Sequence, residues 1–504
     1  MDILNGLATI LTSPAMMGWV VLAALVGMIV GAIPGLTASA AIAMLLPITF
    51  YMDPLAALAF LYVIGKSGRY GGSIAAILFN TPGTAASAAT QIDGYPLSKR
   101  GMSSKAMKVA TISSVIGDFT GEIMLIAGVG IIAAIALKLG PPELFAVYFA
   151  AFVVIGSVIG KSIVKGLASA ALGVLVKTVG IDPITTSERF TFGSYDLQGG
   201  IALVPLMIGI FVLGEVFTQI ESKGGKVEQF GEPDSDEARA RNRLSWTEYK
   251  PCVPHVIRSS FIGAFIGILP GLGSAIAAFV AYGEGKRRAK NPEKWGKGAL
   301  EGVAAPEAAN NAVSGPSMAP LLTLGIPGST IGAIMVGVFL IHGIQVGPTL
   351  FLVQRELVYS LFAAGLIGIA AYGLIGYYGA ALVGRFILQI PTRVLYPLIF
   401  LTAFIAAYAS RSSLFDVWIM VIAGFGGWLM KKLDFNPAAF VISFVLAGGA
   451  EETFRQSLLL SDQGVLIFVT RPVALLFLVI GFAAVFMRVR SLSQQAKTAS
   501  LGDA

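Results

Sequence analysis

Four short breaks, each built around a Pro-Gly pair, interrupt apolar stretches of this sequence. Each break ends on a hydroxyl residue, after which small residues resume, a pattern that predicts the start of a capped half-helix. A helix that begins inside a membrane presents unpaired N–H groups and the positive end of its dipole, which a carboxylate would satisfy. Pro and Gly could instead only kink helices for packing, but four breaks favour the binding interpretation. The breaks read GAIPGLT (31–37), NTPGT (80–84), ILPGLGS (268–274) and GIPGS (325–329).

A polar stretch lies just before the fourth break. Asn310 and Asn311 lie three and four residues after Glu307, so all three share one face of a predicted helix. Their side-chain oxygens could bind sodium, or Glu307 could carry a proton. The alternative is that Pro306 starts this helix and Glu307 is only a first-turn acid.

Two bases precede the second break within an apolar run. Lys66 and Arg69 could pair with substrate carboxylates, because a base at membrane depth is costly and usually functional. They could instead extend to a membrane interface if their helix is shifted. Asp118 and Glu122, one turn apart in a later apolar run, could line a cavity or contact these bases.

The composition indicates which elements position these groups. The chain has 504 residues, of which 56% are hydrophobic and only 12% charged, against roughly a quarter charged in soluble domains. Apolar runs of about 20 residues recur and strand-like alternation is absent, so we expect an all-α polytopic membrane protein with about 10–12 transmembrane segments. The net charge of +7 resides in short links and reports topology, not nucleic-acid binding. One cysteine and two histidines exclude an intramolecular disulfide and disfavour a metal cluster or cofactor.

The breaks recur in the same order in two halves, which predicts an internal repeat. The first half has bases after its second break, at 98–108, whereas the second half has them between its breaks, at 284–297. If basic links stay in the cytoplasm, equivalent links lie on opposite sides, so the repeat is inverted. The predicted regions are a first repeat at 1–220, a cytoplasmic linker at 221–255, a second repeat at 256–487 and a cytoplasmic tail at 488–504.

The rule that basic links stay in the cytoplasm also predicts re-entrant hairpins. Only one apolar run separates the linker from the basic link at 284–297, and one span cannot return to its own side. We therefore expect two half-helices meeting at Pro270 to Gly273, with a matching hairpin at 16–50 whose tip is Pro34 and Gly35. The alternatives are two short full spans, or one Pro-kinked helix with one loop assigned to the wrong side.

Several motifs also resemble one family. GAIPGL, YGGSIAAILFNTPGTAASAATQIDGYPL, GILPGLGSAIAAFVAYGEGKR, GVAAPEAANNAV, LTLGIPGS and EETFRQSLLLS are similar to the large membrane subunit of the tripartite tricarboxylate transporters, over nearly the whole chain. The resemblance implies a bacterial inner-membrane, multi-pass secondary transporter for organic carboxylates, coupled to Na⁺ or H⁺. It implies two partners, a small four-helix membrane subunit and a periplasmic solute-binding protein. One difference from the family lies just before YGGS. The family tends to have small or apolar residues there, whereas this chain has Lys66, Ser67 and Arg69.

These arguments give one set of candidate residues. The predicted cation-binding residues are Glu307, Asn310 and Asn311. For the function, a passive anion channel is the nearest alternative to a secondary transporter. An intramembrane enzyme is a weaker alternative, because no Ser/His pair or zinc signature is evident. The predicted substrate-binding residues are Gly35, Thr37, Lys66, Arg69, Asn80, Thr81, Pro82, Gly83, Thr84, Gly271, Gly273, Ser274, Gly325, Pro327, Gly328 and Ser329.

Overall fold

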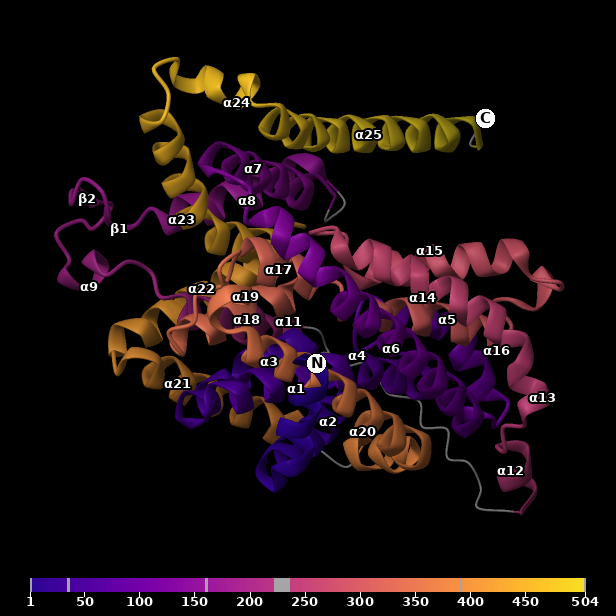
Figure 1. Ribbon diagram of the computed structural model, residues 1–504. Coiled ribbons are helices and arrows are strands. Elements are labelled where there is room, and N and C mark those ends of the chain that lie inside the picture. The colour runs from indigo at the N-terminus through magenta and orange to yellow at the C-terminus, as the bar shows by residue number, and fades with distance from the viewer. Residues whose placement is uncertain (1, 34–36, 159–161, 222–235, 389–391, 503–504) are drawn as a thin grey trace.

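The computed structural model describes residues 2–33, 37–158, 162–221, 236–388 and 392–502 (Figure 1). Helices make up most of these ranges. Two short strands, β1 (Gly180–Ile181) and β2 (Glu188–Arg189), pair antiparallel in one loop. The predicted all-α membrane fold is therefore confirmed, whereas the inverted relation of the two halves stays a prediction.

The first half contains one long helix, α4 (Pro54–Phe79), that is buried along nearly its whole length. The first-half elements differ widely in length, because the predicted breaks divide the apolar runs. They are α1 (Asp2–Thr12), α2 (Pro14–Ala32), α3 (Ala38–Leu45), η1 (Leu46–Tyr51), α4 (Pro54–Phe79), α5 (Ser87–Lys99), α6 (Ser103–Ala136), α7 (Pro141–Val158), α8 (Ile163–Lys177), α9 (Tyr195–Gln198), α10 (Leu203–Met207), the π-helical η2 (Ile208–Leu213) and α11 (Gly214–Glu221).

The second half begins with short helices and ends with long ones. Its elements are α12 (Asp236–Arg241), α13 (Trp246–Tyr249), η3 (Lys250–Cys252), α14 (Val253–Ile268), α15 (Gly273–Arg288), η4 (Pro292–Lys294), α16 (Leu300–Ala312), α17 (Met318–Leu324), α18 (Thr330–Ile341), α19 (Leu350–Val353), α20 (Arg355–Leu388), α21 (Thr392–Arg411), α22 (Leu414–Lys432), α23 (Pro437–Leu459), η5 (Gly464–Leu466), α24 (Ile467–Thr470) and α25 (Pro472–Gly502).

Seven helical segments in the described ranges are long and apolar enough to cross a membrane, and shorter apolar helices accompany them. The prediction of about 10–12 segments therefore exceeds the number of full-length spans. The breaks explain the difference, because they leave helices such as α18, with 12 residues, too short to cross alone.

Helix α4 positions the polar groups because it is buried on nearly every side. It packs against α2, α5, α6 and α20, so it joins elements of both halves. The approach of α2 depends on small residues, since a Cβ added at Gly31 would lie 2.2 Å from the carbonyl oxygen of Gly68. Such close helix contacts are typical of membrane proteins.

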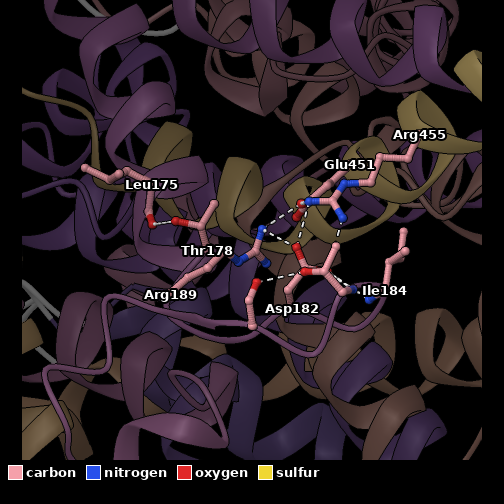
Figure 2. Close-up of polar contacts among 9 residues, drawn as sticks. Leu175, Thr178, Asp182, Ile184, Arg189, Glu451 and Arg455 are labelled. Carbon is pink, nitrogen blue, oxygen red and sulfur yellow. Dashed lines mark hydrogen bonds and ion pairs between the residues drawn. The ribbon is translucent and has the colours of Figure 1, made fainter.

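The loop between α8 and α10 is attached to α23 by ion pairs (Figure 2). Arg455 donates to both carboxylate oxygens of Asp182, at 3.1 and 2.7 Å, and also to Glu451 at 2.6 Å. Arg189 donates to Glu451 at 2.7 Å. In Figure 1 this loop, with β1, β2 and α9, lies at the opposite end of the molecule from α12 and α13.

Two predicted boundaries can be compared with the helices. The described part of the predicted linker docks on the start of α6, where Lys105 contacts Asn242 at 3.0 Å and Glu248 at 2.5 Å. Helix α25 continues across residue 488 without a break, so no helix end marks the start of the predicted tail.

Candidate functional site

The four predicted breaks meet at one cavity of about 320 Å³. Residues from distant parts of the chain line it, and α23 contributes residues that the sequence interpretation did not include. The lining residues are Thr37, Ala38, Ser39, Arg69, Thr84, Ala85, Gly271, Leu272, Gly273, Ser274, Ala275, Gly328, Ser329, Thr330, Ile331, Ala438 and Ile442. We call this cavity the central pocket.

The tip between α14 and α15 forms one wall of the central pocket. Gly271 has φ of +86° and Gly273 has φ of +68°, a region that favours glycine, which explains why glycines flank Leu272. The backbone N–H of Gly271 donates to the carbonyl oxygen of Gly328 at 3.1 Å. The third and fourth breaks are therefore joined directly at the pocket. Helices α14 and α15 pack against each other, while the re-entrant hairpin stays a prediction.

The capping hydroxyls are present at two of the four breaks. Thr37 Oγ1 accepts from the N–H of Ala40 at 3.2 Å and caps α3, and Ser329 Oγ accepts from the N–H of Gly332 at 3.1 Å and caps α18. The tip of the first break, 34–36, including Gly35, lies outside the described residues.

The capping prediction is wrong at the other two breaks. Helix α5 begins at Ser87, three residues after Thr84, and these two side chains bond to each other in the preceding turn. Ser274 lies inside α15, which begins at Gly273 with no side-chain cap. After the second break, a turn separates Thr84 from the start of α5. At the third break, α15 begins at Gly273, whose φ is positive, so Ser274 is already inside the helix.

Arg69 brings a positive charge to the central pocket. Its side chain is buried, and the hydrogen bond that it makes within the described residues runs from Nη1 to the carbonyl oxygen of Asn310, at 3.4 Å. No carboxylate of the described residues forms an ion pair with it. The guanidinium group therefore retains most of its donors for another partner.

Lys66, one turn earlier on α4, has a different environment. It is fully buried, and its Nζ donates to Asp118 at 2.7 Å and to Glu122 at 2.8 Å. Tyr62 donates to Glu122 at 2.7 Å, and Tyr372 lies 3.3 Å from Asp118. The predicted contact between the acidic pair on α6 and a base on α4 is confirmed, and Lys66 does not line the central pocket.

The polar residues of α16 form a second buried network. Glu307 accepts hydrogen bonds from the hydroxyls of Ser73, Thr90 and Ser114. The side-chain amide of Asn311 donates to Ser114 at 2.9 Å and to the carbonyl oxygen of Glu307 at 3.1 Å.

Three amide atoms near this network lack partners. Both polar side-chain atoms of Asn310, and Oδ1 of Asn311, are buried without a hydrogen bond among the described residues. The predicted shared face therefore holds for Glu307 and Asn311, whereas the Asn310 side chain lies outside their network.

Several predicted substrate residues support the pocket without lining it. The Thr81 hydroxyl donates to the carbonyl oxygen of Phe79, the N–H of Gly83 donates to the carbonyl oxygen of Gly72, and Gln91 donates to Asn80. The predicted residues that are described but do not line the cavity are Lys66, Asn80, Thr81, Pro82, Gly83, Gly325 and Pro327.

The sequence interpretation missed Ser39, Thr330 and the start of α23. Asn436 caps α23 by accepting from the N–H of Ala439 at 3.0 Å, and Ala438 in its first turn lines the central pocket. The Asn-Pro pair before an apolar run was a helix-start signal, but nothing in the sequence placed it beside the breaks.

The arrangement suits an anion. First-turn residues of α3, α15, α18 and α23 line the central pocket, so the positive ends of four helix dipoles face it together with the Arg69 guanidinium. Helix N-termini and Arg side chains are the groups that proteins use to hold carboxylates.

Comparisons with known proteins give the family. A sequence model of the tripartite tricarboxylate transporter TctA family matches residues 17–442. The chain is similar to the uncharacterized 52.8 kDa protein in TAR-I ttuC' 3'region of Agrobacterium vitis, at 36% identity over 492 residues, 96% of each chain. It is also similar to the uncharacterized protein in TAR-II ttuC' 3'region of that organism, at 37% identity over 227 residues, 45% of this chain and 93% of the relative. The chain therefore belongs to the tripartite tricarboxylate transporter TctA family and is a multi-pass membrane component of such a transporter.

Proposed function

We propose that this chain is a secondary active transporter that takes up organic carboxylates together with a cation. The observation that carries the proposal is the central pocket, where the Arg69 guanidinium and four helix N-termini converge. A carboxylate bound there replaces the water that such groups would otherwise need at membrane depth.

The buried ion pairs explain why Arg69, and not Lys66, is the base for substrate. Lys66 is engaged by Asp118 and Glu122, and removing it would leave two buried carboxylates without their cation. Arg69 has no such partner among the described residues. In this proposal Lys66 stabilises the fold, and Arg69 binds a substrate carboxylate.

Charge balance favours coupling to a cation. The buried groups around α4 comprise two bases, Lys66 and Arg69, and three acids, Asp118, Glu122 and Glu307. With these groups in their ordinary charged forms, the surroundings are not net positive, so a multivalent anion enters at a high cost unless cations accompany it. A passive anion channel, the alternative, would need net positive walls.

The cation is proposed to bind at α16. Asn310 and Asn311 hold buried amide oxygens without partners among the described residues, and such oxygens are suitable ligands for sodium. Glu307 is the proposed carrier if the coupling ion is a proton. Either ion would lie near Arg69, since Arg69 bonds to the backbone of Asn310.

The proposal includes the rest of a tripartite system. The partners are a small four-helix membrane subunit and a periplasmic solute-binding protein, and the site of action is the bacterial inner membrane. Movement of the two inverted hairpins would expose the central pocket to each side in turn.

An enzyme is the weaker alternative, because the described pocket lining contains hydroxyls but no carboxylate, histidine or cysteine to act as a base.

Uptake measurements test the proposal. Cells expressing this chain with its small subunit and binding protein are given labelled mono-, di- and tricarboxylates, while the sodium and proton gradients are collapsed separately. We expect concentrative uptake that one of the two collapses abolishes. Uptake that only equilibrates, whatever the gradients, would support the channel.

A further inference from the structure

A second, strongly basic cavity shares no lining residue with the central pocket. It has a volume of about 1100 Å³ and is lined by the start of α14, the end of α15 and the link that joins α15 to α16. Seven bases and two acids line it. The bases are Arg100, Lys250, Arg258, Arg288, Lys290, Lys294 and Lys297, and the acids are Glu293 and Glu301. We call this cavity the basic cleft.

The charges of the basic cleft are largely uncompensated. Within the described residues, Arg288 is the lining base with an ion pair, which it forms with Glu284. The other six bases have no carboxylate of the described residues within ion-pair distance. A cluster of this kind raises the local concentration of anions.

The floor of the cleft holds a polar group that lacks a partner. His255 is 9% exposed, and its Nδ1 atom is buried without a hydrogen bond among the described residues. The His255 ring lies 5.6 Å from the ring of Trp295, which is also buried and lines the cleft. His255 is itself among the lining residues, so a buried polar group with unused hydrogen-bonding capacity lies beside the bases of the cleft.

The cleft is preformed and not a set of free surface lysines. Asp93 of α5 accepts from the backbone N–H groups of Gly296, Gly298 and Ala299 at 2.9, 2.7 and 2.8 Å. Tyr282 of α15 also donates to Asp93, at 2.9 Å. These four hydrogen bonds fix the basic link against α5 and tie α5 to α15.

The surface beside the cleft is apolar. Ile257, Phe261 and Phe265 recur every four residues on α14, and they are 50%, 47% and 63% exposed. Helix α14 belongs to a segment long and apolar enough to cross a membrane, so this exposed apolar row is suited to contact with acyl chains. Arg258 of the cleft directly follows Ile257, so the cationic wall lies next to the first apolar residue of that row.

We propose that the basic cleft binds the phosphate headgroup of an anionic phospholipid of the cytoplasmic leaflet, whose acyl chains lie along the apolar row of α14. The basic links are predicted to be cytoplasmic, and basic pockets between helices on that side suit anionic headgroups. The adjoining apolar row favours a lipid over a soluble phosphate. This inference does not depend on which carboxylate or which cation the chain transports.

The test compares lipid binding to the purified full-length chain in a neutral detergent. Phosphatidylglycerol is titrated in, and the midpoint of thermal unfolding gives the half-saturating concentration, because a ligand of the folded state raises that midpoint. The cleft variant Arg258→Gln/Lys294→Gln removes two lining bases. The control variant Lys99→Gln/Lys286→Gln removes two exposed bases that do not line the cleft.

We expect the wild type and the control to bind alike, and the cleft variant to need roughly 30-fold more lipid, at about 1 kcal/mol for each base. Equal binding by the two variants, or an equal response to zwitterionic phosphatidylcholine, would overturn the proposal. An equal shift with inorganic phosphate or glycerol phosphate would assign the cleft to a soluble anion instead of a lipid. If the cleft variant does not fold, Lys290→Gln/Lys297→Gln takes its place.

Discussion

Replacing Arg69 by Met tests the central pocket most directly. Met has similar length and is compatible with a helix, so the substitution removes the guanidinium charge while α4 can keep its packing. In the structure the change also removes the contact with the Asn310 backbone, a long hydrogen bond of 3.4 Å. The main effect should therefore fall on the substrate and not on the fold.

The magnitude follows from the interaction that is lost. A hydrogen bond to a charged group contributes about 1.5–3 kcal/mol, which corresponds to roughly 10- to 150-fold in apparent affinity. We expect Arg69→Met to raise the half-saturating carboxylate concentration within this range. Arg69→Lys should have an intermediate effect, because an ammonium group keeps the charge but loses the paired donors.

The assay is initial uptake of a labelled carboxylate in cells, over a concentration series, with the amount of each variant in the membrane measured in parallel. Thermal unfolding of the purified variant serves as the folding control. Wild-type half-saturation by a stably expressed Arg69→Met protein would refute the assignment of Arg69 to substrate binding. A loss of uptake accompanied by loss of the folded protein would show that Arg69 acts in folding.

Three further predictions concern stability. Lys66→Met should destabilise the fold by about 3–5 kcal/mol, because it leaves two buried carboxylates unpaired, and the midpoint of thermal unfolding should rise again when both are changed to amides. Gly31→Leu should prevent the approach of α2 to α4 and abolish the monodisperse peak in size-exclusion chromatography, whereas a normal elution profile would contradict that packing. Hydrogen bonds from Arg455 lower the pKa of Asp182, so its contribution to stability is full above about pH 3.9 and declines as pH falls toward the lowered value. Asp182→Asn should remove that acid dependence in thermal unfolding measured between pH 3 and 6.

The local features of the chain were predictable from sequence because they depend on neighbouring residues. A Pro-Gly pair favours a helix end just before it, and α4 and α17 do end at their C-cap residues Asn80 and Gly325, two residues before Pro82 and Pro327. The hydroxyl caps were predicted less well, since Thr37 and Ser329 cap their helices but Thr84 and Ser274 do not. A hydroxyl caps a helix only if it directly precedes the first helical residue, so a shift of one residue in the helix start removes the cap.

The role of each base could not be predicted in the same way. Lys66 and Arg69 are three residues apart on one helix, and the sequence treated them as equivalent. Helix α6 brings Asp118 and Glu122 within hydrogen-bonding distance of Lys66 and not of Arg69, and Arg69 lines the central pocket. The contribution of α23 was equally hidden, because its residues are more than 100 positions from the nearest break.

The sequence by itself determined that this is a helical membrane protein, where its helices break, and which polar residues occur at membrane depth. These properties follow from composition and from local backbone chemistry. The tertiary structure alone decided that the breaks converge on one pocket, that Arg69 lines it, and that Lys66 is neutralised by α6. The physical reason is that the effect of a buried charge depends on the charges packed against it, and packing joins residues that are distant along the chain.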